Sequence, residues 1–196
     1  MIIYVNGPSS SGKSSIIKAV QFIYDKPIVN VSVDMFTKSI DNKFSGFGNK
    51  SNILHTFRQK QDKKGYITEV ILGKHAGTFK KIMNEMILNF AKKGFDIIVD
   101  DVVKNDKDLQ SIKKKLGKYG ILFVKITCPL NILNEREMIR GDRAWGLARR
   151  QSEKMKKMNF PFDISIDTSN TDPFEGARGI LQKTFSKKSK EKKKNT

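Results

Sequence analysis

The chain has 196 residues, with 38 Lys and Arg against 20 Asp and Glu, which leaves a formal net charge of +18 at pH 7. Its length is typical of one domain with a hydrophobic core, and its 13 Phe residues argue against global disorder. No apolar run is long enough for a membrane span, the first residues lack the basic region of a signal peptide, and the single Cys128 excludes an internal disulfide. We therefore expect a cytoplasmic protein without membrane partners, and its charge favours polyanionic partners such as nucleic acid or phosphorylated molecules.

Short apolar runs alternate with amphipathic patterns along the chain. This alternation predicts an α/β fold in which helices cover both faces of a five-stranded parallel sheet. The expected strands are 2–6, 28–33, 97–99, 121–127 and 164–166. The expected helices are 13–24, 77–93, 107–116, 130–140, a basic stretch that runs to about 157, and 173–185. Residues 41–65 are rich in Gly, Asn and Ser and predict a long polar loop.

The C-terminal end is more basic than the rest of the chain. Residues 183–196 contain seven Lys and one Glu. A run of like charges cannot bury apolar surface, so this segment predicts a disordered tail behind one folded domain over residues 1–182. A solvated end is the favoured interpretation, ahead of an electrostatic arm or a localisation signal.

The turn after the first expected strand carries the most specific pattern, G-x-x-x-x-G-K-S over residues 7–14. Small residues let backbone N–H groups surround the phosphates of ATP, at the start of a helix whose dipole favours negative charge. The Lys13 charge can follow the transferred phosphoryl group, and the Ser14 hydroxyl can bind Mg²⁺. The nucleotide-binding residues expected here are Gly7, Ser9, Ser10, Ser11, Gly12, Lys13, Ser14 and Ser15.

Acidic residues follow two other expected strands. Asp100 and Asp101 come directly after residues 97–99, and a carboxylate at this position holds Mg²⁺ in P-loop enzymes. We favour Asp100 for the metal and leave Asp101 to contact the substrate or cap the turn. Asp34 ends the second strand, where two interpretations remain open: it accepts a proton from the acceptor hydroxyl, or it caps the turn over residues 35–40.

Three arginines, Arg136, Arg140 and Arg143, recur at helical spacing. Over the phosphates they would neutralise charge in a transition state, as in the lid of a kinase, here about residues 136–158. The alternative is a set of surface ion pairs with Glu135, Glu137 and Asp142. The P-loop in the same chain favours the lid. The basic residues behind it, from Arg149 onward, indicate a solvated face or a field at the substrate entry and not catalytic groups.

These motifs follow the order found in chloramphenicol phosphotransferase-like proteins, which the chain resembles over residues 1–182. The most distinctive part is Arg-Gly-Asp-Arg-x-x-Gly-x-Ala-x-x-Gln over residues 140–151, followed by Phe162-Asp163 and Asp167-Thr168. The resemblance implies an adenylate-kinase-like, three-layer P-loop fold and ATP-dependent phosphorylation of a small-molecule hydroxyl. It also implies that Asp34 is the general base, that the three arginines belong to an Arg-rich lid, and that Asp167 and Thr168 approach the adenine.

Other functions remain open. One is a nucleotide-sugar kinase similar to the zeta toxins, and another is an ATP-binding regulatory protein whose basic surface binds nucleic acid. Six of the net charges fall in the expected tail, and some of the rest fall on Lys13, the predicted lid arginines and the basic stretch behind them, which favours phosphate chemistry over nucleic-acid binding. Because residues 42–64 are polar and basic, we expect them to suit an anionic acceptor. The sequence does not predict an oligomeric state.

Overall fold

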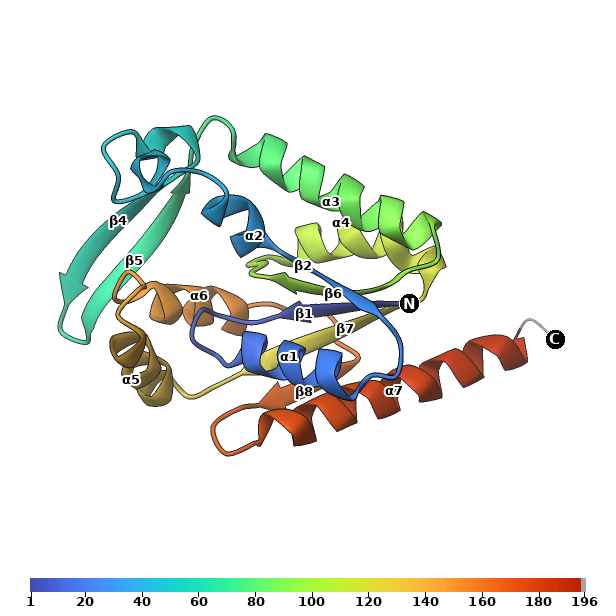
Figure 1. Cartoon of the computed structure of the whole chain (residues 1–196). Coiled ribbons are helices and arrows are strands. Elements are labelled where there is room, and N and C mark those ends of the chain that lie inside the picture. The colour runs from blue at the N-terminus through green and yellow to red at the C-terminus, as the bar shows by residue number, and fades with distance from the viewer. Residues whose placement is uncertain (195–196) are drawn as a thin grey trace.

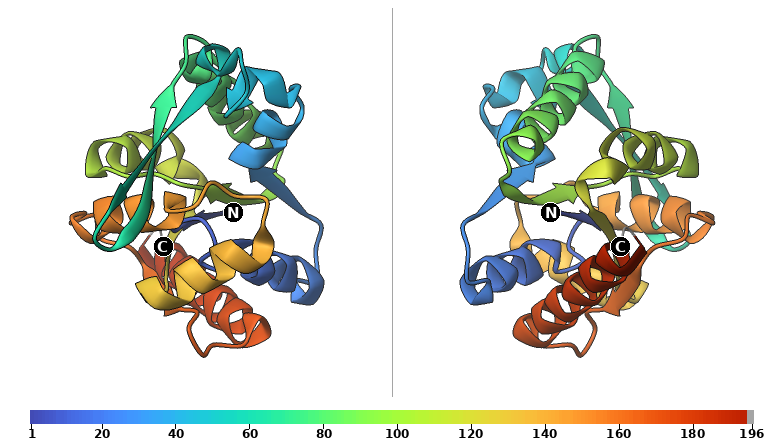
Figure 2. Two further views of the ribbon diagram at one scale, coloured as in Figure 1. Left: turned by 90° about the vertical axis from the view of Figure 1, so that its left-hand side faces the viewer. Right: turned by 90° about the vertical axis from the view of Figure 1, so that its right-hand side faces the viewer.

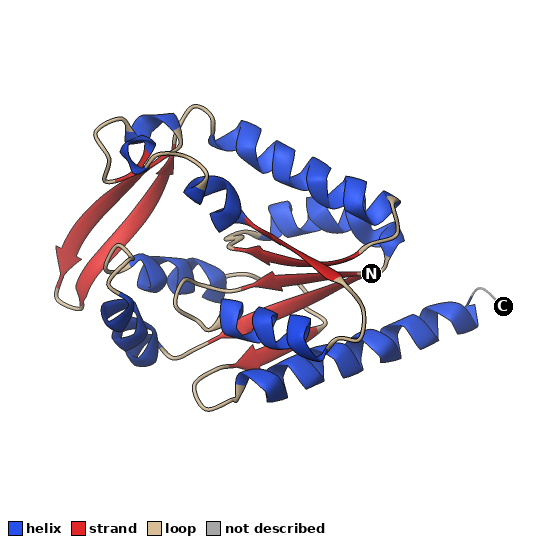
Figure 3. Ribbon diagram, in the orientation of Figure 1, coloured by secondary structure: helices blue, strands red, loops and turns tan. Residues whose placement is uncertain are grey.

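The computed structural model describes residues 1–194, and the side chains of residues 1–187. A five-stranded sheet lies at its centre, and every pair of neighbouring strands in it is parallel (Figures 1 and 3). In spatial order the strands are β2 (Ile28–Ser32), β6 (Asp96–Asp101), β1 (Ile2–Asn6), β7 (Ile121–Thr127) and β8 (Ile164–Asp167). The predicted α/β fold and its five strands are thereby confirmed.

Both faces of this sheet are covered by helices, so the molecule has three layers (Figures 1 and 2). On β1, Ile3 and Val5 face one cluster of buried residues, while Ile2 and Tyr4 face the other. Successive strand side chains point to opposite faces, which is why a buried strand is apolar at every position. The first cluster includes residues of α1 (Lys13–Ile23) and α7 (Pro173–Lys194). The second includes residues of α3 (Ala76–Lys92) and α4 (Asp106–Leu116).

The parallel register brings the carboxyl ends of three strands to one edge. Asn6 lies beside Asp101, and Ser32 lies beside Asp100. The Asn6 amide holds the segment after β6, since it donates to Val103 O at 3.0 Å and accepts from Val103 N at 2.8 Å. The P-loop and the acids of the neighbouring strands therefore start from the same edge, where ligands bind in open α/β sheets.

The remaining elements lie mostly above this edge and around it, except for the 3-10 helix Gly117–Tyr119, which precedes the start of β7 at the opposite edge. They are α2 (Val33–Lys38), β3 (Ser45–Gly46), β4 (His55–Asp62), β5 (Gly65–Leu72), α5 (Leu130–Arg140), α6 (Leu147–Lys156) and three short 3-10 helices, Asn42–Phe44, Ser51–Ile53 and Gly117–Tyr119.

The prediction of a long loop over residues 41–65 is wrong, because these residues and those that follow form a second sheet in the order β3-β4-β5. β4 and β5 form an antiparallel hairpin, in which His55 pairs with Leu72 at the open end and Asp62 pairs with Gly65 at the turn. The Asp62 side chain accepts from Lys64 N at 2.8 Å, and Gly65 has a φ of +99°, which suits glycine at a tight turn. Much of β4 is exposed and polar, so its sequence lacks the apolar alternation that indicates a strand.

The C-terminal helix α7 extends to Lys194, through most of the predicted disordered tail; residues 195–196 lie outside the described residues. Thr184 is buried and donates to Ile180 O. Lys187 Nζ lies 2.8 Å from Asp163 Oδ1 and donates to Ile121 O. The first turn of this segment therefore packs on the domain. No helix in the described part of the chain has the length and apolar character needed to cross a membrane.

We expect Lys187→Met to lower the free energy of unfolding by about 0.5–1 kcal/mol, because it removes a partly exposed ion pair and one hydrogen bond to a carbonyl. Chemical denaturation followed by circular dichroism measures this change. Lys183→Met, one helical turn earlier and exposed, is the control and is expected to leave the stability unchanged. Equal effects of the two substitutions would contradict the contact made by Lys187.

Candidate active site

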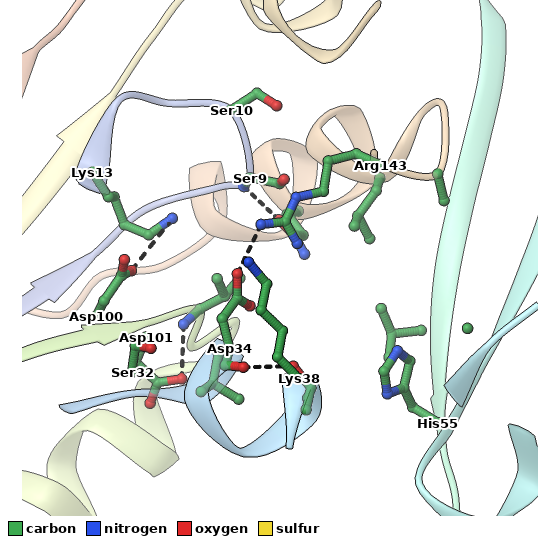
Figure 4. A pocket seen from close by; sticks show the side chains of 18 of the residues that line it. Ser9, Ser10, Lys13, Ser32, Asp34, Lys38, His55, Asp100, Asp101 and Arg143 are labelled. Carbon is green, nitrogen blue, oxygen red and sulfur yellow. Dashed lines mark hydrogen bonds and ion pairs between the residues drawn. The ribbon is translucent and has the colours of Figure 1, made fainter. Parts of the chain in front are cut away.

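A cleft of about 1320 Å³ opens above the carboxyl edge of the central sheet (Figure 4). The P-loop forms one wall, α2 and α3 a second, and the β4–β5 hairpin with the α5–α6 segment the rest. Gly7 and Asp167 are not among its lining residues. The predicted site residues that do line it are Ser9, Ser10, Ser11, Gly12, Lys13, Ser14, Ser15, Asp34, Asp100, Asp101, Arg136, Arg140, Arg143 and Thr168.

The P-loop curls around the Lys13 ammonium group, which donates to Gly7 O and Pro8 O, each at 2.9 Å. Gly12 has a φ of +82°, and Ser10, at +59°, is the single non-glycine residue with a positive φ among the described residues. The buried hydroxyl groups of Ser10 and Ser11 have no hydrogen-bond partner within this part of the chain. Unsatisfied polar groups at a helix N-terminus are what phosphate oxygens need as partners.

Asp100 faces the P-loop. Its Oδ2 lies 3.2 Å from Ser14 Oγ, and its Oδ1 lies 3.9 Å from Lys13 Nζ. Burial raises the pKa of Asp100, against the opposing effects of Lys13 and Ser14, and burial lowers the pKa of Lys13. The side-chain oxygens of Ser14 and Asp100 fit Mg²⁺. This hard cation usually takes one or two protein ligands and completes its coordination with water and phosphate oxygens. The described residues contain no group of three or more His, Cys, Asp or Glu side chains able to hold a metal ion.

Asp101 points toward α3 instead. It is 3% exposed and accepts hydrogen bonds from Tyr4 Oη and Lys80 Nζ, while its Oδ1 lies 2.8 Å from Val102 N. Burial, together with the charge of Asp101, raises the pKa of Tyr4 well above its ordinary value. The two adjacent acids therefore have different surroundings, because successive residues of β6 point to opposite sides of the sheet.

Asp34 lies in the first turn of α2. Ser32 caps this helix, since its Oγ accepts from Met35 N at 3.1 Å, so the alternative in which Asp34 caps the turn is wrong. Asp34 Oδ2 lies 2.7 Å from a terminal nitrogen of Arg143 (Figure 4). Burial would raise the pKa of Asp34, but the hydrogen bond and charge of Arg143 outweigh it and lower that pKa. The carboxylate is therefore ionised at neutral pH.

The three predicted lid arginines have different partners. Arg143 lies between Asp34 and Asp142, whereas Arg136 donates to Thr168 O at 2.7 Å and to Thr168 Oγ1 at 3.2 Å. Arg140 pairs with Asp142 at 3.2 Å, both side chains being at least 40% exposed, as in the surface ion-pair interpretation. Arg136 thus connects α5 to the turn after β8, and Arg143 connects the α5–α6 segment to α2.

Two residues that position the cleft have roles that the sequence did not predict. Glu137 is 2% exposed and accepts from Gly146 N at 2.6 Å and Ala148 N at 2.9 Å, so it satisfies the start of α6 and does not form a surface ion pair. Gln151 Oε1 accepts from Ser9 N at 2.6 Å and joins α6 to the P-loop. Gln151 belongs to the distinctive motif that ends at residue 151, whereas Glu137 has no local sign of burial.

The β4–β5 hairpin docks on α6 through charged side chains. Arg149 is buried, and its two terminal nitrogens lie 2.8 and 2.5 Å from the carboxylate oxygens of Asp62. Arg150 and Lys154 both reach Glu69 Oε1, at 3.2 Å each. The prediction of a solvated face from Arg149 onward is therefore wrong for Arg149, because a strand pairs with it.

The turn before α6 lies directly against β5. Trp145 O accepts hydrogen bonds from Gln59 and Thr68, and the Trp145 ring packs on Tyr66 with 5.7 Å between centroids. Gly146 has a φ of +81°, and a Cβ at this position would lie 2.3 Å from Tyr66 O. Only glycine fits here, so the hairpin and α6 form one packed unit beside the cleft.

The chain matches the family model "Chloramphenicol phosphotransferase-like protein" over residues 1–185. A comparison with curated protein sequences gives no significant match. Among solved structures, a sugar kinase from Janibacter sp. HTCC2649 is similar, with 14% identity, 92% of each chain covered and a TM-score of 0.62. The shikimate kinase of Aquifex aeolicus vf5 has 19% identity, with 95% of this chain and 97% of that chain covered and a TM-score of 0.53.

A third similar structure is the Mycobacterium tuberculosis APS kinase in complex with AMPPNP and APS. It has 12% identity, with 93% of this chain and 95% of that chain covered and a TM-score of 0.58. At such identities the similarity shows the fold alone, which is that of P-loop kinases.

We expect Glu137→Gln to lower the free energy of unfolding by about 2 kcal/mol, because one of the two N–H groups at the start of α6 loses its acceptor and meets an amide donor. Chemical denaturation measures the effect. Glu135→Gln is a matched control on the exposed face of the same helix. A Glu137→Gln protein as stable as the control would contradict the capping role.

The pKa of Asp62 is held at about 2, below its ordinary value of 3.8, chiefly by its hydrogen bonds from Arg149. A lowered folded-state pKa means that this pair stabilises the docked hairpin above about pH 3.8, and that its contribution is lost as the pH falls through about 2. We expect Arg149→Met to move the midpoint of Asp62 up toward 3.8, as read from the carboxyl carbon shift by NMR. An unchanged midpoint in the variant would refute the pairing.

Proposed function

Since the chain belongs to the chloramphenicol phosphotransferase-like protein family, we propose that it is a kinase that transfers the γ-phosphate of ATP to a hydroxyl group of a small molecule. One observation carries this proposal: Asp34 lines the same cleft as the P-loop and Asp100. A proton acceptor and a phosphate-binding loop in one cleft are the parts that phosphoryl transfer to an alcohol needs. The similar kinase structures support the same class of reaction.

In this proposal the P-loop N–H groups and Lys13 hold the β- and γ-phosphates, and the unpartnered Ser10 and Ser11 hydroxyls add donors. Ser14 and Asp100 hold Mg²⁺, which neutralises phosphate charge when it is bound. The turn at Asp167 and Thr168 lies beside the adenine, held in place by Arg136. AMPPNP in the similar APS kinase is consistent with an adenine nucleotide in this position.

The acceptor hydroxyl lies beside Asp34. A bond forms between the hydroxyl oxygen and the γ-phosphorus, the bond from that phosphorus to the β–γ bridging oxygen breaks, and ADP leaves. The hydroxyl proton passes to the Asp34 carboxylate, which is ionised at neutral pH beside Arg143. Arg143 and Arg140 stabilise negative charge on the transferred group, with the segment of residues 136–158 acting as the lid.

Asp34→Asn tests the assignment of the general base. With Mg-ATP and a panel of hydroxyl compounds that includes a nucleotide sugar, we expect acceptor-dependent release of ADP to fall about 10²–10⁴-fold. The affinity for AMPPNP should remain, because Asp34 lies outside the P-loop. Asp41→Asn is the control, an exposed carboxylate near the same cleft that pairs with Lys43.

The panel also separates the alternatives. Transfer to the nucleotide sugar alone would assign the chain to that class of kinases. Salt-sensitive RNA binding with no transfer to any acceptor, or an Asp34→Asn variant with full transfer activity, would overturn the proposal.

A further inference from the structure

The cleft continues beyond Asp34, away from the P-loop. We call this part the acceptor chamber. Its walls are α2, the loop after β3, β4, β5, α3 and the segment after β6, and it is lined by Phe36, Phe47, Phe57, Leu72, Phe79 and Lys104. The proposed function places the acceptor hydroxyl beside Asp34, and the specificity of the chamber for one kind of alcohol rests on that placement.

The walls of the acceptor chamber are largely apolar and aromatic. Phe47 and Phe57 pack edge to face with 5.3 Å between centroids, and Phe36 and Phe79 do so with 6.4 Å. Two of the lining side chains keep much of their surface open, since Phe47 is 65% and Leu72 is 70% exposed. A ligand with a flat apolar body would cover this surface and take it out of water.

The cations of the chamber are not equivalent. Lys80 pairs with the buried Asp101, and Lys43 pairs with Asp41 at 3.2 Å. Lys104 is half-buried, yet it has no hydrogen bond and no ion pair with any residue that the structure describes. Burial lowers the pKa of Lys104, and the charges of Lys154 and Arg150 act in the same direction, against the opposing charges of Asp101 and Glu69. Lys104 is therefore a partly desolvated cation whose burial cost an anion would offset.

A second hollow adjoins Lys104. It has a volume of about 250 Å³, and Lys104, Lys154, Lys157 and the acidic Asp106 are among its lining residues. The Asp106 carboxylate accepts hydrogen bonds from Asn159 N and Phe160 N, so it is already engaged. Lys154 pairs with Glu69, and Asp106 lies near Lys157, so Lys104 itself is the cation that an anion in the chamber meets.

His55 lies on β4 across the cleft from Asp34 (Figure 4). Its ring packs on Phe57 with 5.1 Å between centroids. Burial lowers the pKa of His55 below 6.5, with the charge of Asp34 opposing this change and the charge of Lys104 adding to it. At neutral pH the ring is uncharged, so it adds hydrogen-bonding atoms to the chamber and no counter-charge.

We propose that the acceptor chamber binds an alcohol whose aromatic body carries an anionic group. The phenylalanine side chains pack on the body, Lys104 binds the anionic group, and the hydroxyl lies at Asp34. Lys104 then selects charged acceptors over neutral ones of the same shape, because a neutral molecule leaves this cation desolvated without a partner.

The test compares matched probes by calorimetry on the full chain with Mg-AMPPNP present. The charged probes are meta- and para-(hydroxymethyl)benzoate, and the neutral ones are the corresponding benzamides. We expect at least one benzoate to bind about tenfold tighter than its benzamide, in line with a charge-assisted hydrogen bond. Lys104→Met should reduce this preference to about twofold or less, whereas Lys107→Met, an exposed lysine outside the chamber, should keep it.

Thermal unfolding of both variants establishes that they are folded before binding is compared. Benzamides that bind as tightly as benzoates, a preference that persists in Lys104→Met, or no binding of any probe would each overturn the inference. Because binding is measured with AMPPNP, it does not depend on transfer. Selective benzoate binding without phosphorylation by Mg-ATP would support the chamber's specificity and contradict the placement of the probe's hydroxyl beside Asp34.

Discussion

The candidate site depends on the parallel register of β2, β6 and β1, which sets Asn6 beside Asp101 and Ser32 beside Asp100. Parallel strands end at the same edge of a sheet, so residues from three distant parts of the chain meet there without special loops. Alternation along β6 then directs Asp100 to the P-loop and Asp101 to Lys80. A slip of one residue in this register would exchange the two acids and turn the core side chains of β6 to the wrong face.

A second level of organisation rests on α6. Glu137 holds its start, Gln151 connects it to Ser9 of the P-loop, and Arg149 fastens the hairpin to it through Asp62. One helix thus joins the phosphate end of the cleft to the wall of the acceptor chamber. These contacts match several of the 38 Lys and Arg residues with acids, so the net charge of +18 comes from other residues. Lys104 differs from them because it lies half-buried without such a partner among the described residues.

The parts of the fold that could be predicted are those with a local signal. Strands buried on both faces appear as apolar runs, and the P-loop appears as fixed residue types at fixed spacing, so the five strands, the P-loop and the acids at the strand ends were all predictable. The hairpin was not, because the partner of Asp62 lies 87 residues away and β4 has little apolar pattern. The later part of the C-terminal helix was not predicted, because a Lys-rich composition gives no sign that Thr184 and Lys187 contact the rest of the domain.

The central sheet, the P-loop and the family can be recognised from the sequence, since each follows from neighbouring residues or from motif spacing. Three features become visible when distant segments pack together: Ser32 and not Asp34 caps α2, Glu137 and Arg149 are buried partners, and Asp34 shares a cleft with Lys104 and His55. The reason is physical: burial and pairing of a charged side chain depend on which distant segments surround it, and a charged residue looks the same in the sequence whether it faces water or a buried partner.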